Sequence, residues 1–193
     1  MIIGLTGGIG SGKSMVAKAF GVMGCMVFNS DDAAREIYFD TEVKAQVIAL
    51  LGKESYAGEK VLNKAFIGSK IFSDTVVLHQ LNAIIHPAVR KRFEAFVEQH
   101  KGAIIMKESA LLFEAKLDKD MDRIVLVVAD DELRISRVMQ RDGLSREDVL
   151  KKIKSQLPQE EKIILSDHII RNNEQELVIP QVMSVLEKLK AHA

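Results

Sequence analysis

The sequence predicts an α/β fold in which a five-stranded parallel sheet lies between two layers of helices. Two observations carry this prediction. Short apolar runs rich in β-branched residues alternate with longer helical patterns along most of the chain. The runs also lack the strict polar–apolar alternation of half-exposed strands, as expected when helices cover both faces. A chain of 193 residues suits a single domain of this kind, spanning residues 1–193.

Five apolar runs are the predicted strands, and RIVLVVA is the clearest of them. In chain order the strands are residues 2–6, 25–29, 102–108, 123–129 and 168–172. The predicted helices are residues 14–23, 41–51, 63–72, 73–100 and 174–191, with a further helix from a cap at Asp130 or Asp131 to Arg141. Because a residue before proline disfavours the helical conformation, we expect His86-Pro87 to interrupt the helix of residues 73–100.

Two regions break the strand–helix rhythm. Residues 32–100 contain no convincing strand and form a helical insertion between the second and third predicted strands. Residues 143–166 are charged and helical, with Pro158 among them. Insertions on the loop side of a parallel sheet commonly carry substrate lobes and lids. We therefore expect a helical substrate-binding insertion at 32–100 and a lid at 143–166.

The net charge, the length of the apolar stretches and the cysteine count limit which classes of protein this chain can belong to. The chain has 27 basic and 27 acidic residues, so no global positive field favours nucleic acid or an anionic membrane. No apolar stretch approaches the length of a membrane span, and the N-terminus lacks the pattern of a signal peptide. The single cysteine, Cys25, cannot form an internal disulfide. These features predict a cytoplasmic globular protein.

The stretch GGIGSGKS, here called the phosphate loop (residues 7–14), fits the spacing G-x-x-x-x-G-K-S/T between a strand and a helix. Its glycines let backbone N–H groups curl around a phosphate, and the helix N-terminus adds its dipole. Lys13 can reach the β and γ phosphates, and the Ser14 hydroxyl can ligate Mg²⁺. The loop predicts a nucleoside triphosphate site. The guanine-reading motif N-K-x-D of GTPases is absent from the sequence, so a small-molecule kinase becomes the leading interpretation.

Two carboxylates follow predicted strands at the sheet edge that carries the phosphate loop. Asp31, in FNSDDAAR, is a candidate catalytic base, although capping of the next helix by Ser30, Asp31 or Asp32 explains one of these residues equally well. Glu108 ends the third strand, where an acidic residue commonly binds the magnesium shell through water. A strand-end charge without function is the alternative for Glu108.

Three arginines, Arg134, Arg137 and Arg141, recur at spacings of three and four and so share one helix face. Their guanidinium groups suit a transferring phosphate. A solvated basic face is the alternative, and the sequence favours it for Arg134. Arg146 and Lys162 lie farther along, in the expected lid.

Histidine and asparagine provide the remaining candidates. His79 and His86 lie in the helical insertion, where they bind substrate or serve a structural role. Asn172 and Asn173 follow the last strand, where they meet the edge of an adenine or form a turn.

Taken together, these stretches resemble one family, the dephospho-coenzyme A kinases, over nearly the whole chain. The matching segments, in the family's order, are IIGLTGGIGSGKS, FNSDDAAR, NAIIHP, ESALLFE, VMQRDGLSRED and SDHIIRNN. The resemblance implies a P-loop NTPase-type fold with a CoA-binding insertion and a lid. It also implies that ATP phosphorylates the ribose 3′-hydroxyl of dephospho-CoA, the last step of coenzyme A synthesis.

The resemblance also implies roles for single residues. Asp31 matches the second aspartate of the family's D-A-D segment, its catalytic base, and Arg141 matches an arginine that contacts phosphate. The expected ATP-binding residues are Gly8, Gly10, Ser11, Gly12, Lys13, Ser14, Met15 and Asn172. The expected Mg²⁺ residues are Ser14 and Glu108, and the expected substrate-binding residues are Asp31, His79 and His86.

The chain departs from the family pattern at four places. Asn29 stands where the first aspartate of D-A-D is usual, and Glu108 replaces an aspartate. Ala110 replaces a proline before LLFE, and Met15 stands where threonine is common. None of these changes removes an indispensable group, although the longer arm of Glu108 alters the magnesium geometry.

The resulting hypothesis is an in-line phosphoryl transfer in which Lys13 and Arg141 offset the charge of the moving group and Asp31 takes the hydroxyl proton. The expected partners are ATP and dephospho-CoA, without nucleic acid or membrane, in a monomer or a small homo-oligomer. Two rival functions stay open. One is another small-molecule kinase, such as a nucleoside monophosphate kinase, and the other is a slow nucleotide-dependent switch.

Overall fold

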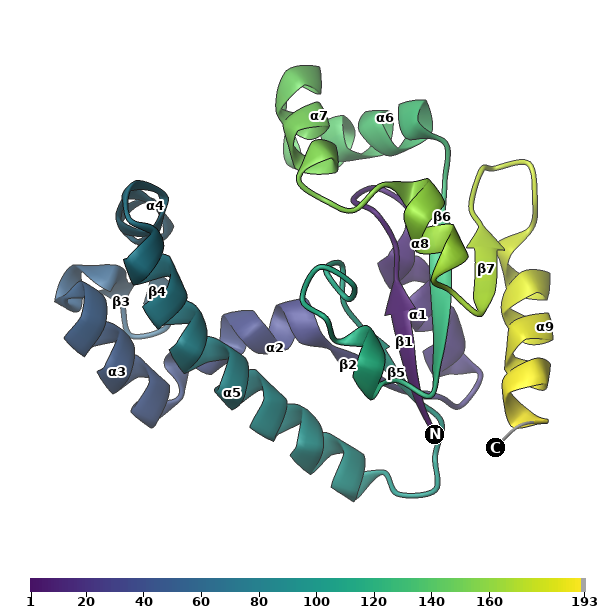
Figure 1. Ribbon diagram of the computed structural model, residues 1–193, viewed down its shortest axis with the longest axis horizontal. Helices are drawn as coiled ribbons and strands as arrows, with labels where there is room; N and C mark the ends of the chain where they lie inside the picture. The colour runs from purple at the N-terminus through teal and green to yellow at the C-terminus, as the bar shows by residue number, and fades with distance from the viewer. Residues whose placement is uncertain (192–193) are drawn as a thin grey trace. The chain divides into compact units, whose positions relative to one another are not determined.

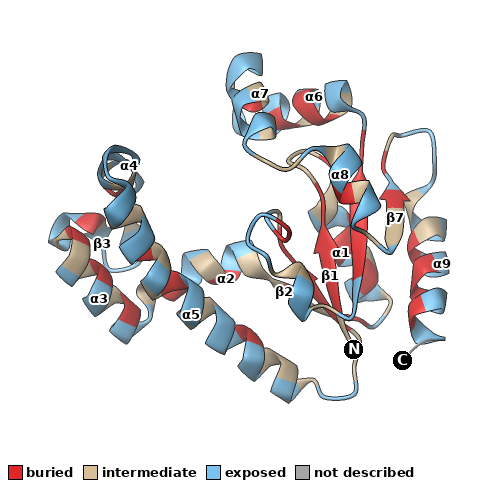
Figure 2. Cartoon of the chain, viewed as in Figure 1, coloured by how far each residue is buried: buried red, intermediate tan, exposed pale blue. Residues whose placement is uncertain are grey.

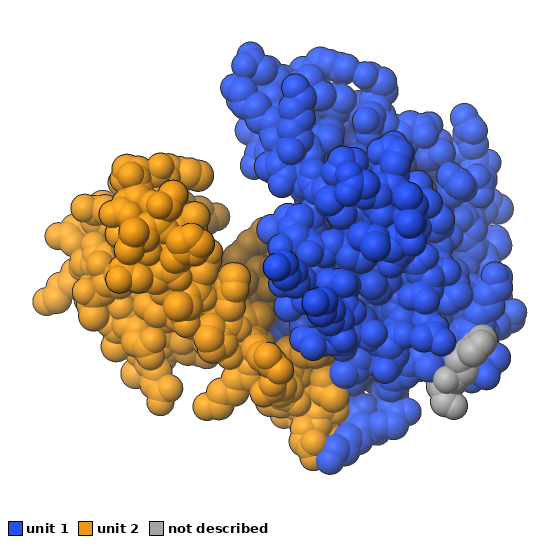
Figure 3. All heavy atoms as spheres, viewed as in Figure 1, with its two compact units in different colours: residues 1–29, 100–193 blue, residues 30–99 orange. Residues whose placement is uncertain are grey.

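The computed structural model describes residues 1–191, and the chain divides into two compact units (Figure 3). Unit 1 combines residues 1–29 with residues 100–193, and unit 2 is the intervening segment, residues 30–99. Each unit buries its own cluster of apolar side chains. Unit 1 contains the parallel sheet.

The sheet of unit 1 has five parallel strands in the order β2–β5–β1–β6–β7 (Figure 1). The strands are β1 (Ile2–Thr6), β2 (Met26–Asn29), β5 (Ile105–Glu108), β6 (Arg123–Val128) and β7 (His168–Arg171). The predicted five-stranded parallel sheet is therefore confirmed. β5 begins later than predicted because Gly102 has a φ of 83° and the Ala103 N–H turns back to the carbonyl of His100.

One face of the sheet packs against α1 (Lys13–Val22) and α9 (Val178–Lys190). The spacing of Val16 and Phe20 places both on one side of α1, and both are fully buried. Figure 2 shows buried residues along the strands of the sheet and on one side of α9. The residues of β6 alternate between the faces, so Val125 and Val127 join this core. α9 begins later than the predicted residue 174, because Glu174 has a φ of 67°, which a helix cannot contain.

The opposite face is covered by α8 (Gln159–Ile164) and by the loop that follows β5. Leu112 and Phe113 of that loop pack against Ile124 of β6. α6 (Asp131–Asp142) and α7 (Arg146–Lys154) form a separate apolar cluster, to which Ile9 of the phosphate loop contributes its side chain. A short 3₁₀ helix, Asp118–Asp120, completes the elements of unit 1.

Unit 2 is mainly helical. Its elements are α2 (Ser30–Glu36), α3 (Thr41–Leu51), α4 (Lys64–Ser73), α5 (Thr75–Gln99), the strands β3 (Tyr56–Gly58) and β4 (Val61–Leu62), and 3₁₀ helices at Ile37–Phe39 and Lys53–Ser55. Val47, Ile67 and Leu81 lie at the centre of its core. The expectation of no strand in residues 32–100 was wrong, because β3 and β4 form an antiparallel pair. This pair is too short to show a hydrophobic alternation.

The predicted interruption at His86-Pro87 was also wrong, because α5 runs unbroken through Pro87. Pro87 lacks the N–H that would reach the carbonyl of residue 83, so the helix loses one hydrogen bond there. Burial of Leu81, Ile85 and Phe93 on both sides of Pro87 fixes the helix by tertiary packing. None of the helices within residues 1–191, α5 included, is long and apolar enough to cross a membrane.

Candidate functional site

The phosphate loop connects the end of β1 to the start of α1 and requires glycine at two positions. Gly10 and Gly12 have φ angles of 80° and 87°, in the left-handed region that other residues rarely adopt. Space is limiting as well: a Cβ on Gly10 would lie 2.5 Å from the Arg134 carbonyl oxygen, and one on Gly12 would collide with the Asn172 side chain. The loop therefore packs closely against α6 and the end of β7.

Side chains from distant parts of unit 1 brace this loop. The Ile9 N–H donates to Gln156 Oε1 at 2.9 Å, and the Ile9 carbonyl accepts from Arg134 Nε at 3.0 Å. The carbonyl of Ser11 accepts from Asn172 Nδ2 at 2.8 Å. Both polar groups of the Ile9 peptide are thus satisfied by protein, and the loop conformation is fixed without a ligand.

Lys13, Ser14 and Glu108 form a polar cluster beside the loop, of which Glu108 is the buried member. Glu108 Oε1 accepts from Lys13 Nζ at 2.9 Å and from Ser14 Oγ at 2.8 Å. The second oxygen of Glu108 accepts from Asn29 Nδ2 at 3.3 Å. The register of the strands brings these side chains together, because Glu108 of β5 lies opposite Leu5 of β1 and Asn29 of β2. The carboxylate is only 2% exposed, so its charge is neutralised mainly by Lys13.

The cluster has the chemistry of a magnesium–phosphate site. Mg²⁺ prefers oxygen ligands and is usually bound by one or two protein oxygens together with substrate phosphates and water. Ser14 Oγ and the Glu108 carboxylate supply such oxygens within hydrogen-bond distance of each other. A bound triphosphate would compete with Glu108 for Lys13, whose ammonium group is a good phosphate ligand. The residues present therefore fit Mg²⁺ with a nucleotide.

Two further predicted ATP-binding residues border this site. Asn172 is buried, and its carbonyl accepts from Arg137 Nη1 at 3.2 Å while its side chain holds Ser11. Met15 lies in the first turn of α1, with its side chain 49% exposed and its N–H bonded to the Gly12 carbonyl at 3.0 Å.

The three arginines of α6 have different surroundings. The interpretation of Arg134 as part of a solvated face is wrong, because the residue is only 4% exposed. Its guanidinium group occupies the space that a Cβ on Gly8 would need, and it pairs with Asp131 at 2.8 Å. Arg141 forms a bidentate pair with Asp142 at the C-terminal end of α6, which raises the pKa of the arginine. Within residues 1–191, both hydrogen bonds of the Arg141 guanidinium group go to Asp142 and none to the phosphate loop.

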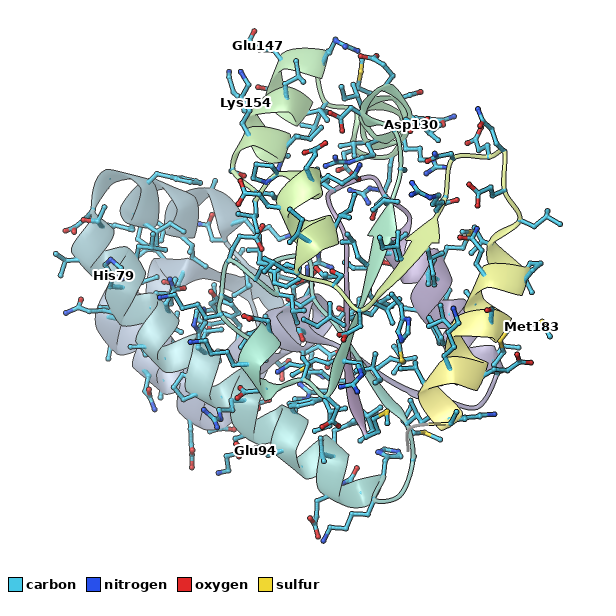
Figure 4. The ribbon with its side chains drawn as sticks, turned by 45° about the vertical axis from the view of Figure 1, so that its right-hand side comes forward. His79, Glu94, Asp130, Glu147, Lys154 and Met183 are labelled. Carbon is cyan, nitrogen blue, oxygen red and sulfur yellow. The ribbon has the colours of Figure 1, made fainter. Side chains whose placement is uncertain are left out.

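The remaining predicted residues belong to unit 2. Asp31 is exposed in the first turn of α2, two residues after Asn29, and its neighbour Asp32 pairs with Arg35. His79 and His86 are exposed on α5, and Figure 4 shows His79 projecting from that helix. The roles of these three residues stay predictions.

Sequence analysis named Arg134 and Asn172, but for other roles, and it missed the contact between Gln156 and Ile9 that braces the phosphate loop. Gln156 and Ile9 are 147 positions apart, and Gln156 stands in a charged segment where a glutamine draws no attention. A faint signal exists for Ile9, the one large apolar residue among the glycines of residues 7–14. Its hydrophobicity is used in packing against α6 and α7.

Comparison with known proteins agrees with the geometry. A family model described as dephospho-CoA kinase matches residues 1–177. A dephospho-CoA kinase of Chlorobaculum tepidum is 39% identical over 184 residues, covering 90% of this chain and 86% of its own length. Another, of Bacteroides fragilis, is 37% identical over 187 residues, covering 95% of this chain and 90% of its own length.

A solved structure has the same fold. Dephospho-CoA kinase from Campylobacter jejuni superposes with a TM-score of 0.72 at 22% identity, covering 100% of this chain and 98% of that one. This likeness confirms the predicted P-loop NTPase-type architecture. With the family model spanning most of the sequence and the relatives matching nearly end to end, the chain belongs to the dephospho-CoA kinase family.

Proposed function

We propose that the protein transfers the terminal phosphoryl group of ATP to the ribose 3′-hydroxyl of dephospho-CoA, giving CoA and ADP as the last step of coenzyme A synthesis. The observation that carries this proposal is the Lys13–Ser14–Glu108 cluster beside a braced phosphate loop, in a member of this family. A preformed cradle of this kind positions a triphosphate without reorganisation at the moment of transfer.

In the proposed mechanism the phosphate loop binds the ATP phosphates through its backbone N–H groups and the N-terminus of α1. Lys13 leaves Glu108 and contacts the β and γ phosphates. Ser14 and Glu108 would hold Mg²⁺, directly or through water, where it would supply positive charge to the phosphates. Asn172 and Met15 line the nucleotide, with Asn172 near the adenine.

Asp31 is the proposed catalytic base, which accepts the proton of the 3′-hydroxyl as the new P–O bond forms. Arg141 is proposed to leave Asp142 and contact the phosphates when nucleotide is bound. This change costs little, because an ion pair between exposed neighbouring residues is weak. Residues 32–100, most of which form unit 2, are the proposed CoA-binding insertion, with His79 and His86 contributing. Residues 143–166 are the proposed lid.

The test measures ADP release from ATP and Mg²⁺ with dephospho-CoA, adenosine or AMP as acceptor, with Lys13→Met as the matched inactive control. We expect strong stimulation by dephospho-CoA alone, with CoA as product and loss of turnover in the control. Stimulation by AMP instead would identify a nucleoside monophosphate kinase. No stimulation by any acceptor, in protein that binds ATP, would favour a nucleotide-dependent switch.

A further inference from the structure

Lys162, a fully buried lysine of unit 1, has no part in the mechanism above. Lys162 lies on α8, which packs against β6, and its side chain is only 1% exposed. Its Nζ lies 2.9 Å from Oε1 of Glu114, in the loop that follows β5. Glu114 is itself held in place, because the same oxygen accepts from the Leu157 N–H at 2.8 Å.

The ammonium group of Lys162 keeps unused donors. One carboxylate oxygen cannot satisfy all the N–H donors of an ammonium group. Within residues 1–191, Nζ makes the ion-pair contact with Glu114 and no well-directed hydrogen bond. Buried donors without acceptors are unfavourable, and those that persist in a native protein call for an explanation such as a catalytic role or an absent ion.

Lys162 lines a cavity that reaches the phosphate loop. The cavity has a volume of about 350 Å³, and its lining includes Gly8, Arg134, Lys154, Gln156 and Lys162. Gly8 belongs to the loop itself, and Arg134 and Gln156 are the residues that clamp its Ile9 peptide. The cavity therefore adjoins the segment that binds the triphosphate.

Basic side chains outnumber acidic ones by one in the lining of this cavity, and Glu114 already pairs with Lys162, so an anion would have to compete with that carboxylate. Two carboxylates, Asp131 and Glu160, also line it, but Asp131 is already paired with Arg134. Of the two lysines that line the cavity, Lys154 is exposed on α7 (Figure 4), whereas Lys162 is buried. Removal from water strengthens the attraction between a buried ammonium group and a phosphate oxygen.

We propose that Lys162 is a further catalytic residue, which donates hydrogen bonds to oxygens of the transferring phosphoryl group, while Glu114 holds the lysine in position. This inference rests on the proposed phosphoryl transfer. In that step the bond between phosphorus and the β–γ bridging oxygen breaks, and a bond to the acceptor oxygen forms. The acceptor proton goes to Asp31, and Lys162 stays protonated throughout.

The first test separates this role from a structural one. Lys162→Met removes the charge at similar length but leaves Glu114 partly buried and unpaired. The double variant Lys162→Met with Glu114→Gln removes both charges, so no unpaired carboxylate is left in the partly buried position of Glu114. We expect the double variant to unfold at nearly the wild-type temperature, with kcat lowered about 10²-fold and little change in the KM for ATP. Lys188→Met, at an exposed lysine of α9 outside the proposed lid, serves as the matched control with unchanged kcat.

A second test does not depend on the acceptor. Binding of ADP and Mg²⁺ is compared with and without aluminium fluoride, which mimics the transferring phosphoryl group. We expect the double variant to bind ADP like the wild type but to lose at least tenfold of the extra affinity that aluminium fluoride provides. Wild-type turnover in the double variant, or equal aluminium fluoride binding, would overturn the role of Lys162. If dephospho-CoA does not stimulate ADP release by the wild type, the proposed function is wrong. The aluminium fluoride comparison still decides the role of Lys162 in that case.

Discussion

Two lysines of unit 1, Lys13 and Lys162, have side chains largely removed from water, and each pairs with a glutamate from one short stretch of chain. Glu108 ends β5 and contacts Lys13, and Glu114 follows six residues later and contacts Lys162. A buried ammonium group needs such a partner, because an isolated charge in a low-dielectric interior is strongly unfavourable. Both pairs also keep a cation ready for an anionic substrate that competes with the carboxylate.

At the residue scale, we expect Asp31→Asn to lower turnover by about 10²- to 10⁴-fold, because an amide cannot accept the hydroxyl proton. ATP affinity should stay near that of the wild type, since the phosphate loop is braced by other residues. The measurement is steady-state kcat together with direct ATP binding. Asp32→Asn is the matched control, because both aspartates lie in the first turn of α2 and share its helix dipole. Wild-type turnover in Asp31→Asn would rule out the base.

A second residue-scale prediction concerns acid stability. Partial burial alone would raise the pKa of Glu114. The contacts with Lys162 and the Leu157 N–H lower this pKa by more than burial raises it, so the pKa lies below its ordinary value of 4.5. The carboxylate therefore stabilises the fold above that value, and this stabilisation is lost as the pH falls through the lower, folded-state pKa. Thermal unfolding temperatures of the wild type and Glu114→Gln should differ at pH 7 and converge below pH 4. A constant difference across this range would contradict the assignment.

At the scale of elements, the joint between α7 and α8 connects two functional loops. Its Gln156 binds the peptide of Ile9, and the adjacent Leu157 N–H binds Glu114. The side chain of Ile9 packs between α6 and α7. The expected lid is therefore fastened to the phosphate loop by both polar and apolar contacts.

This joint gives a prediction for Gln156→Ala. The change leaves the Ile9 N–H without its acceptor, which costs about 1–3 kcal/mol, so the KM for ATP should rise about tenfold. Turnover at saturating ATP should change less, because the reacting groups stay in place. Gln156→Glu, which keeps an oxygen that can accept the hydrogen bond, should recover most of the affinity. An unchanged KM in Gln156→Ala would show that the loop holds its shape without this bond.

The elements that could be predicted from the sequence are those whose residue types are dictated by one strong local requirement, such as burial on both faces or an unusual backbone conformation. β1 is apolar before Thr6 and β6 is apolar after Arg123, because both faces of these strands are buried, and the phosphate loop needs its glycines for backbone geometry. The β3–β4 pair and the start of α9 depend on turns with weak signals. The burial of Arg134 could not be foreseen, because it requires the missing side chain of Gly8, which is far away in sequence.

At the scale of the whole molecule, the two units have separate cores, and the residues that brace the phosphate loop all belong to unit 1. We expect the substrates to divide between the units. Hydrogen exchange with ATP and Mg²⁺ should slow amides of residues 7–16, and exchange with dephospho-CoA should slow amides of unit 2. Protection by dephospho-CoA confined to unit 1 would contradict a CoA-binding role for residues 32–100.

The bracing of the phosphate loop also has a consequence for synthesis on the ribosome. The loop is made early, yet the side chains that hold it come from positions 134, 156 and 172. A nascent chain whose β7 is still inside the ribosome lacks the hydrogen bond from Asn172 to Ser11. Its phosphate loop therefore lacks one of these three contacts. We therefore expect the fully braced loop to form only after the last strand of the sheet has been made.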